Sequence, residues 1–406
     1  MDLSQWSRVH PFLWHHQPRQ AGGGLVAAHA DQRTLAAMDE RVGEEASALA
    51  DLSGVVTPVH LLPDAHPGFG IPHGSVVGFA PAEAKLLLNG TGAFDHAFGL
   101  RALISPLHQG DVAPVLAQLE AALQAVLVAP PGCEPSDAMF VAGAHWAVEQ
   151  GWGYLEDLAV CEDQGLIAGC DPDTIQSDIQ RRWLEALRRP GLGNHQLEIH
   201  AVDHLLDQDS AMAFGLDLGQ LLVLIHAGSA GLGPRLAGAS LPPGGQLSWL
   251  PLGSEAGQRA LQCQRIALNA AAAFRQVLTH QVRKQFSRFW PEGDLTVLCD
   301  FPHNSFRREA HWLGHDSVEL WVPRCGSVRA FGPSHGEHPE AFHNLGTPVI
   351  LAGAFGGTTE LVCGVDSAEQ LALSSTICGM GTAEVAEHAG LCRRVARLRP
   401  LLSIQG

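Results

Sequence analysis

Lysine is nearly absent from this chain, which has only Lys85 and Lys284 among its 406 residues. A P-loop needs a lysine directly after its glycines, lysine-linked nucleotidyl transfer needs a KxDG motif, and Schiff-base chemistry needs an amine in a pocket. Lys85 lies in AEAKLLL and Lys284 in VRKQF, and neither string matches any of these patterns. These enzyme classes are therefore excluded. The zinc protease motif HExxH is also absent.

Basic charge and paired cysteines are scarce as well. The formal net charge is −17, which excludes a general polyanion binder, so an RNA site would have to be local or neutralised by metal. No DNA-specific motif is present. The nine cysteines are scattered without a CxxC pair, so neither a disulfide framework nor a zinc ribbon is expected.

Long apolar runs are missing too. No stretch of eighteen apolar residues exists, and the N-terminus MDLSQWSRVH lacks a signal-peptide pattern. We therefore expect a cytoplasmic protein without a membrane span. Hydrophobic residues make up 46% of the chain, which is enough for a substantial core, and no linker or repeat marks a boundary. This predicts a single domain over residues 1–406.

The expected secondary structure mixes helices and strands without regular alternation. Residues 55–80 indicate a strand, a loop rich in Pro, Gly, Asp and His, and a second strand. Residues 112–190 have helical patterns, with Asp111 as a candidate cap, and predict a helical insertion beside the sheet. Further strands are expected at 195–202, 221–225 and 295–299, with a helix over 260–286. The predicted fold class is α+β.

Histidine is unusually frequent, with 22 residues. Five short strings place His or Asp beside Gly or Asn, in most cases at the end of an apolar run: PDAHPGFG, FDHAFG, GNHQLE, LIHAGSAG and DFPHNS. A scaffold presents side chains to a site from such strand ends. One such histidine alone would be a core or turn residue, but five similar strings indicate a metal site. An Asp with several neutral imidazoles suits Mn²⁺ or Zn²⁺.

A competing interpretation uses the glycines at 228–233, GSAGLG, which follow the apolar run LLVLI. These could form a dinucleotide-binding turn. Pro234 and the pair Pro242-Pro243 interrupt the long helix that such a turn requires, which argues against this interpretation.

Seven strings together resemble the RtcB-type RNA ligases in order and approximate spacing, over about residues 55–348. They are PDAHPGFGIPHG, FDHAFGLRALI, EQGWGYLEDL with GCDP, GLGNHQLEI, FGLDLGQLLVLIHAGSAGLG, DFPHNS and WVPRCGSVRAF. The resemblance implies an RtcB-like fold, with mixed sheets around a central metal pocket and helices at the periphery. Those enzymes join an RNA end bearing a 3′-phosphate or 2′,3′-cyclic phosphate to a 5′-hydroxyl end. They use Mn²⁺ and GTP and pass through a guanylylated histidine.

The resemblance also implies roles for individual residues. The positions that match metal ligands are Asp95, His195, His226 and His303. Asp64 matches an acidic residue needed near the metals. The positions that match the lining of the nucleotide site are Asn194, Glu198 and Asn304.

Several positions depart from the family pattern. Phe98 stands where the family has a cysteine that bridges two metals, and Cys378 stands where it has the guanylylated histidine. Ala230 and Cys325 replace an arginine and a lysine, and Gln405 replaces a lysine that contacts the base. Cys378 is either a substitute thiolate nucleophile or a small buried residue. The losses fall on nucleophile, phosphate and guanine contacts, whereas the histidines remain.

Three functions follow as alternatives. The chain is an RNA ligase or RNA-end-processing enzyme with an altered nucleotide scheme, a metal-dependent phosphoesterase that works without GTP, or a non-catalytic homologue that binds RNA ends or a partner. A local basic bias could give an RNA-facing edge or an ordinary solvated helix face; it comprises Arg265, Arg275, Arg283, Lys284, Arg288, Arg307 and Arg308.

Overall fold

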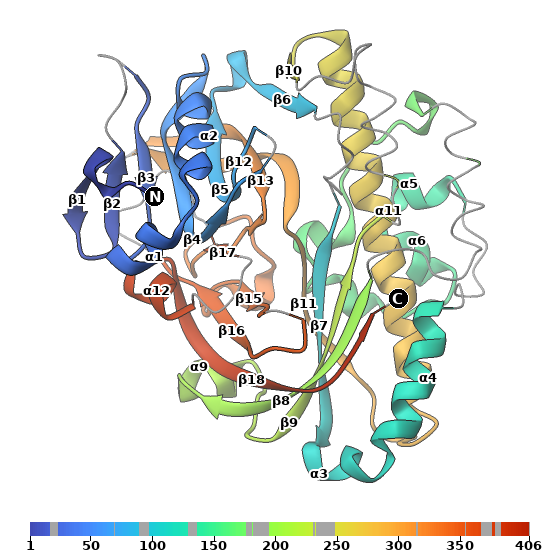
Figure 1. Cartoon of the computed structure of the whole chain (residues 1–406). Coiled ribbons are helices and arrows are strands. Elements are labelled where there is room, and N and C mark those ends of the chain that lie inside the picture. Colours follow the sequence, from blue (N-terminus) through green and yellow to red (C-terminus); the bar gives the residue numbers. More distant parts are fainter. Residues whose placement is uncertain are drawn as a thin grey trace.

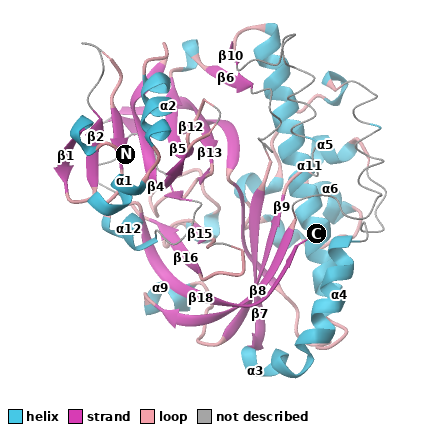
Figure 2. Ribbon diagram, viewed as in Figure 1, coloured by secondary structure: helices cyan, strands magenta, loops and turns pink. Residues whose placement is uncertain are grey.

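Two seven-stranded sheets and a layer of helices make up the molecule in the computed structural model (Figure 1). The structure describes residues 1–16, 23–68, 70–88, 97–128, 136–175, 181, 195–229, 232, 248–313, 316–353, 355–366, 376–377 and 383–405. Helices and strands are mixed throughout, as Figure 2 shows, so the α+β class predicted from the sequence is confirmed.

The first sheet joins the N-terminal strands to a hairpin from much later in the chain. Its order is β1 (Trp6–His10), β2 (Leu13–His16), β3 (Val26–Ala28), β4 (Val55–His66), β5 (His73–Phe79), β13 (Asp316–Cys325) and β12 (Asn304–Leu313). Helices α1 (Gln32–Ala37) and α2 (Glu40–Ala50) lie beside it. In α2, Val42, Ala46 and Leu49 recur at helical spacing and are buried in the core of this sheet.

The second sheet carries most of the histidine strings. Its order is β11 (Thr296–Pro302), β7 (Gly99–His108), β9 (Gln220–Ala227), β8 (Gln196–Leu205), β18 (Cys392–Gln405), β16 (Thr359–Gly364) and β15 (Pro348–Leu351). Two short pairs complete the strands, β6 (Lys85–Leu88) with β10 (Ser248–Pro251) and β14 (Ser327–Val328) with β17 (Thr376–Ile377).

Helix α11 (Glu255–Phe286) packs lengthwise against one face of the second sheet (Figure 1). The helices between β7 and β8 are α3 (Gln109–Val112), α4 (Leu116–Val128), α5 (Ala138–Ala142), α6 (Ala144–Glu149) and α7 (Leu155–Leu158). Of these, α4, α5 and α6 pack against α11. The described part of 112–190 is thus mainly helical, as expected. Asp111 lies at the third position of α3, where it accepts a hydrogen bond from the His108 N–H, so the helix begins earlier than predicted. The division into one domain with an insertion stays a prediction.

Alternation along β9 decides which side chains face the helices. Leu221, Val223 and Ile225 belong to the core shared with α11, whereas Leu222 and Leu224 belong to the core on the opposite face. His226 has the parity of Leu222 and Leu224, so the period of two places its side chain on the face away from α11. Strand geometry thereby directs His226 toward the space between the two sheets.

Two further histidines are buried away from the strand ends described below: His16 lies on β2, and His338 packs beside Pro339 and Phe342. Among the described residues, no helix is long and apolar enough to cross a membrane.

Candidate metal centre at the strand ends

Four adjacent strands of the second sheet end at one place. Pro302 pairs with Gly99, Gly99 pairs with Ala227, and His226 pairs with Gln196. This register puts the residues next to these positions side by side, namely His303, Phe98, His226 and His195. The backbone N–H of His303 also donates to the carbonyl of Phe98 at 3.0 Å. We call the three histidines His195, His226 and His303 the histidine site.

The Phe98 ring lies among all three imidazoles of the histidine site. Its centroid is 4.9 Å from that of His226, 6.3 Å from that of His195 and 6.4 Å from that of His303. Residues from four separate segments of the chain, between positions 98 and 303, therefore meet around one phenyl group. A phenyl ring has no donor atom for a metal, so the centre of this arrangement is apolar.

His226 and His303 face each other directly. Their rings stack with centroids 5.3 Å apart, and their Nε2 atoms are 3.0 Å apart. Burial lowers the pKa of His303 to about 4, and burial together with the nearby His303 lowers the pKa of His226 to about 3. Both imidazoles are therefore neutral at pH 7, which is the form that binds metal ions.

His195 is buried and packs against Phe274 of α11, with ring centroids 5.0 Å apart. Neither of its ring nitrogens has a hydrogen-bond partner among the described residues, and burial lowers its pKa to about 4. An unpartnered buried imidazole is costly unless something binds it. The imidazole of His195 therefore has the properties expected of a metal ligand.

The fit to a metal ion is incomplete within the described residues. No group of three or more His, Cys, Asp or Glu side chains converges there closely enough to hold an ion. The pair of Nε2 atoms is the part that fits, because two imidazole nitrogens only 3.0 Å apart are close enough to bind one ion. Asp95, Asn194, Cys378 and Ala230 lie outside the described residues.

Asp64 lies on β4 of the first sheet. Its Oδ1 is buried without a hydrogen-bond partner in the described chain, and burial raises its pKa to about 7. The neighbouring strand brings His73, whose ring stacks on that of His66 with centroids 4.9 Å apart. Asp64 can therefore exchange a proton near neutral pH.

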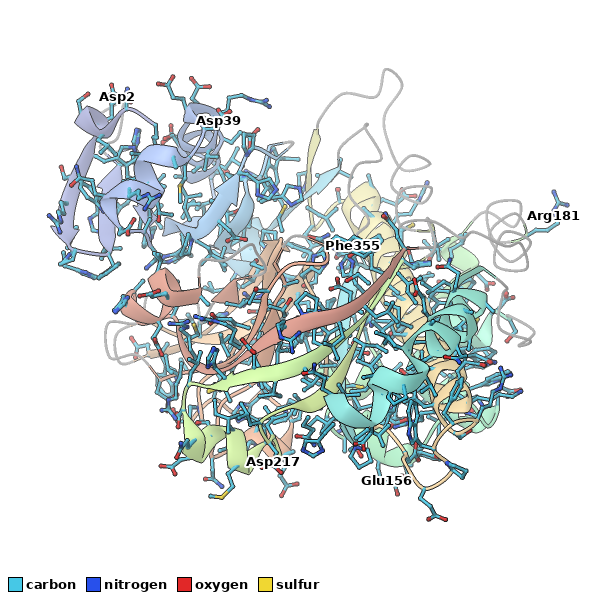
Figure 3. The ribbon with its side chains drawn as sticks, turned by 60° about the horizontal axis from the view of Figure 1, so that its bottom comes forward. Asp2, Asp39, Glu156, Arg181, Asp217 and Phe355 are labelled. Atoms are coloured by element: carbon cyan, nitrogen blue, oxygen red, sulfur yellow. The ribbon has the colours of Figure 1, made fainter. Side chains whose placement is uncertain are left out.

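Glu198 is committed to contacts within the protein. Its Oε1 accepts hydrogen bonds from the Gly356 N–H at 2.9 Å and the Ser403 hydroxyl at 2.7 Å, and His200 Nε2 lies 3.4 Å from its Oε2. Burial raises the pKa of Glu198, but the hydrogen bonds from His200, Gly356 and Ser403 outweigh it and hold the pKa below the usual value. Phe355, which precedes Gly356, is exposed (Figure 3).

The other predicted nucleotide-site positions are near the same edge. Gln405 of β18 pairs with Gln196, which in turn pairs with His226. Asn304 begins β12, and its Oδ1 accepts a hydrogen bond from the Gly326 N–H at 2.9 Å. Asn304 also stands opposite Cys325, which is buried and whose pKa is raised well above the usual value by burial. Cys325 is thus a small buried residue.

Sequence reasoning missed the part played by Arg275 and Asp300. Asp300 belongs to the string DFPHNS, yet its carboxylate forms buried ion pairs with Arg101 and Arg275 and does not face the histidine site. Arg283 pairs with the buried Asp157, and Arg307 pairs with Glu162 and Asp163. Three members of the suggested RNA-facing edge are therefore internal ion-pair partners, and that interpretation is wrong for them. Their pairing with acids distant in sequence has no local sequence signal.

The fold and the strand-end histidines define a class: an α+β protein whose two packed sheets bring neutral imidazoles together at one edge. Comparison with known proteins identifies that class more closely. A family model described as "tRNA-splicing ligase RtcB" matches residues 45–384. The chain belongs to the RtcB family.

Individual relatives agree with this assignment. A protein of Archaeoglobus fulgidus named tRNA-splicing ligase RtcB is 32% identical over 402 residues, covering 92% of this chain and 83% of the relative. One of Thermococcus kodakarensis with the same name is 30% identical, covering 87% and 78%. One of Pyrobaculum aerophilum, also of that name, is 28% identical, covering 92% and 84%.

Proposed function

We propose that this RtcB-family protein binds phosphate-bearing RNA ends at a metal held by the histidine site, and that it does not seal them with GTP. The observation that carries the proposal is the position of Phe98 among His195, His226 and His303. The three imidazoles are kept together, whereas the position that would add a shared ligand carries a phenyl ring. A cytoplasmic location, where broken RNA would be met, goes with this function.

One ion of the Mn²⁺ or Zn²⁺ type would be held by His226 and His303, with His195 and Asp95 completing its ligands. Support comes from the facing Nε2 atoms and from the unpartnered nitrogens of His195. Such an ion supplies a Lewis acid for a phosphate oxygen. It would also provide a local positive charge in a chain whose net charge of −17 otherwise repels RNA.

Guanylylation requires parts that this chain has exchanged. Cys378 stands at the nucleophile position, Cys325 is a buried thiol where a cation would meet phosphate, and Gln405 carries no charge for the base. Asn194, Glu198 and Asn304 would line a nucleotide site, but Glu198 already accepts hydrogen bonds from Gly356 and Ser403. GTP binding is therefore not part of the proposed function.

A second candidate function is phosphoester hydrolysis, which Asp64 favours. Its Oδ1 is buried without a partner among the described residues, and a carboxyl with a pKa of about 7 suits general acid and base catalysis. In this alternative Asp64 would move a proton to or from water or the leaving oxygen, while the histidine site holds the phosphate through its ion.

The proposal is tested by binding of short fluorescent RNAs followed by anisotropy. An RNA with a 3′-phosphate should bind more tightly than the same RNA with a 3′-hydroxyl, in Mn²⁺ only, and EDTA should abolish the difference. His226→Ala should abolish it too. His204→Ala is the matched control, since His204 is an exposed histidine on the neighbouring strand β8. Equal binding of the two RNAs in Mn²⁺ would overturn the proposal, and release of phosphate would favour the second candidate.

A further inference from the structure

Arg275 of α11 contacts all three strand ends that present Phe98, His226 and His303. We infer that Arg275 is a positioning residue that fixes the histidine site in the geometry required for metal binding. The inference rests on the proposed function and names a residue that acts on the metal through others.

The contacts of Arg275 are specific to the strand ends. Its Nη1 donates to the carbonyl of Ala227 at 3.1 Å and to that of Ala97 at 3.4 Å, and these residues adjoin His226 and Phe98. Its Nε and Nη2 donate to Asp300 at 3.0 Å and 2.8 Å, three residues before His303. One planar guanidinium therefore spans the three strands β7, β9 and β11 at their shared edge.

Gly99 provides the space for this guanidinium. A Cβ at position 99 would lie 2.8 Å from Arg275 Nη1 and 2.7 Å from the Phe301 carbonyl. Both distances are too short for a methyl group. The strand that carries Phe98 thus approaches Arg275 as closely as a backbone without a side chain allows.

Two other buried arginines show what is particular to Arg275. Arg101 also binds Asp300, at 2.6 Å, but its remaining hydrogen bonds go to Gln276, Thr279 and Cys161, away from the strand ends. Arg283 lies two turns along α11 and binds Asp157 through two hydrogen bonds of 2.7 Å. Charge neutralisation in the core is common to all three, and contact with the carbonyls beside the histidine site belongs to Arg275.

Lysine cannot replace these contacts. The guanidinium donates in several directions from one rigid plane, whereas an ammonium is a compact point charge on a flexible stem. Arg275→Lys keeps the positive charge beside Asp300 but gives up the simultaneous bonds to Ala97 and Ala227. The histidine site then loses its fixed spacing. Changes to groups that orient metal ligands typically weaken metal affinity about 10- to 100-fold.

The test measures Mn²⁺ affinity from the EPR signal of free Mn²⁺, with thermal unfolding recorded for each variant. Arg275→Lys should weaken Mn²⁺ binding at least tenfold, and Gly99→Ala, which displaces the guanidinium, should do the same. Arg283→Lys is the matched control: it removes a comparable buried bidentate pair and should lower the melting temperature while Mn²⁺ affinity stays within about twofold. Affinity within twofold of wild type in folded Arg275→Lys, or an equal loss in Arg283→Lys, overturns the inference.

A second readout separates this inference from the proposed function. In metal-free protein, ¹⁵N NMR of the imidazoles reports on the Nε2 contact between His226 and His303 without any metal. Arg275→Lys should shift these signals, and Arg283→Lys should leave them unchanged. Unshifted signals in both variants overturn the inference. Shifted signals in a protein whose wild type does not bind Mn²⁺ uphold the positioning role and reject the proposed function.

Discussion

Phe98 is the residue at which the histidine site departs most from a site with two metals. Its ring contacts each imidazole of the histidine site without offering an electron pair. A cysteine there would place a soft thiolate among three nitrogens, which favours Zn²⁺ and Co²⁺.

Phe98→Cys is therefore expected to raise Co²⁺ affinity at least tenfold and to give a thiolate-to-cobalt charge-transfer band. Phe98→Ala, which removes the same ring without adding sulfur, is the control and should lack the band. Absorption spectra during Co²⁺ titration of both variants measure this. Identical spectra for the two variants would show that position 98 does not face the ion.

The raised pKa of Asp64 predicts that the stability of the protein depends on pH. Burial raises its folded-state pKa from 3.8 to about 7, so the folded protein holds a proton that the unfolded chain releases above about pH 4. Wild-type stability should then fall as pH rises from about 4 to 7, by up to about 4 kcal/mol, because each pKa unit is worth about 1.36 kcal/mol. Asparagine at position 64 does not titrate, so the stability of Asp64→Asn should not fall for this reason over the same pH range.

Urea unfolding in EDTA at pH 4.5 and pH 8 measures the effect. The measured quantity is the free energy of unfolding of Asp64→Asn minus that of wild type. This difference should be larger at pH 8 than at pH 4.5. A difference that is the same at both pH values would contradict the assigned pKa.

Helix α7 is joined to α11 by a buried ion pair between Asp157 and Arg283. Arg283 donates to both carboxylate oxygens of Asp157, and Gln276 donates to one of them at 2.7 Å. Asp157→Ala would leave the buried Arg283 guanidinium with only the exposed Asp294, 3.5 Å from its Nε, as an acidic partner.

Removing one partner of a buried ion pair typically costs about 3–5 kcal/mol, so Asp157→Ala should lower the free energy of unfolding by about that amount. Glu156→Ala is the control, since Glu156 is the preceding residue of α7 and lies at the periphery of the molecule (Figure 3). It should change stability by less than about 0.5 kcal/mol. Chemical denaturation of both variants checks this, and similar values for the two would show that the pair does not hold the helix.

Secondary elements with strong local patterns could be predicted from the sequence. The strands β4, β5, β8, β9 and β11 and helix α11 lie where apolar runs and helical spacing indicated them. Strand β18 was not predicted, because its alternating arginines carry a weak signal and its partner β8 lies nearly two hundred residues earlier. The N-terminal strands were missed for a similar reason, since they are short and pair partly with one another.

For the whole molecule, the histidine strings indicated which side chains belong to one site but not how they are held. Apolar runs ending in histidine predicted strand ends, and the register of β11, β7, β9 and β8 brings these ends together. The role of Arg275 could not be predicted, since it depends on the docking of α11 against three strands. The string DFPHNS likewise gives no sign that the carboxylate of Asp300 pairs with the buried Arg101 and Arg275.

The charge of the molecule and the changed positions together predict weak nucleotide binding. Exposed acidic residues lie at opposite ends of the molecule, with Asp2 and Asp39 at one end and Asp217 at the other (Figure 3). The triphosphate also lacks cationic partners at Ala230 and Cys325. Calorimetry with GTP and Mn²⁺ should give no saturable heat, and micromolar affinity would contradict this.

The most direct test of the account is a sealing assay with a broken RNA that carries a labelled 3′-phosphate end and a 5′-hydroxyl end. With Mn²⁺ and GTP, the Archaeoglobus fulgidus relative serves as the positive control. The account predicts that the wild-type protein gives no joined product. Cys378→His should give none either, because Phe98 still replaces the bridging ligand and the phosphate and guanine contacts are still absent. GTP-dependent joining by the wild-type protein would contradict the account.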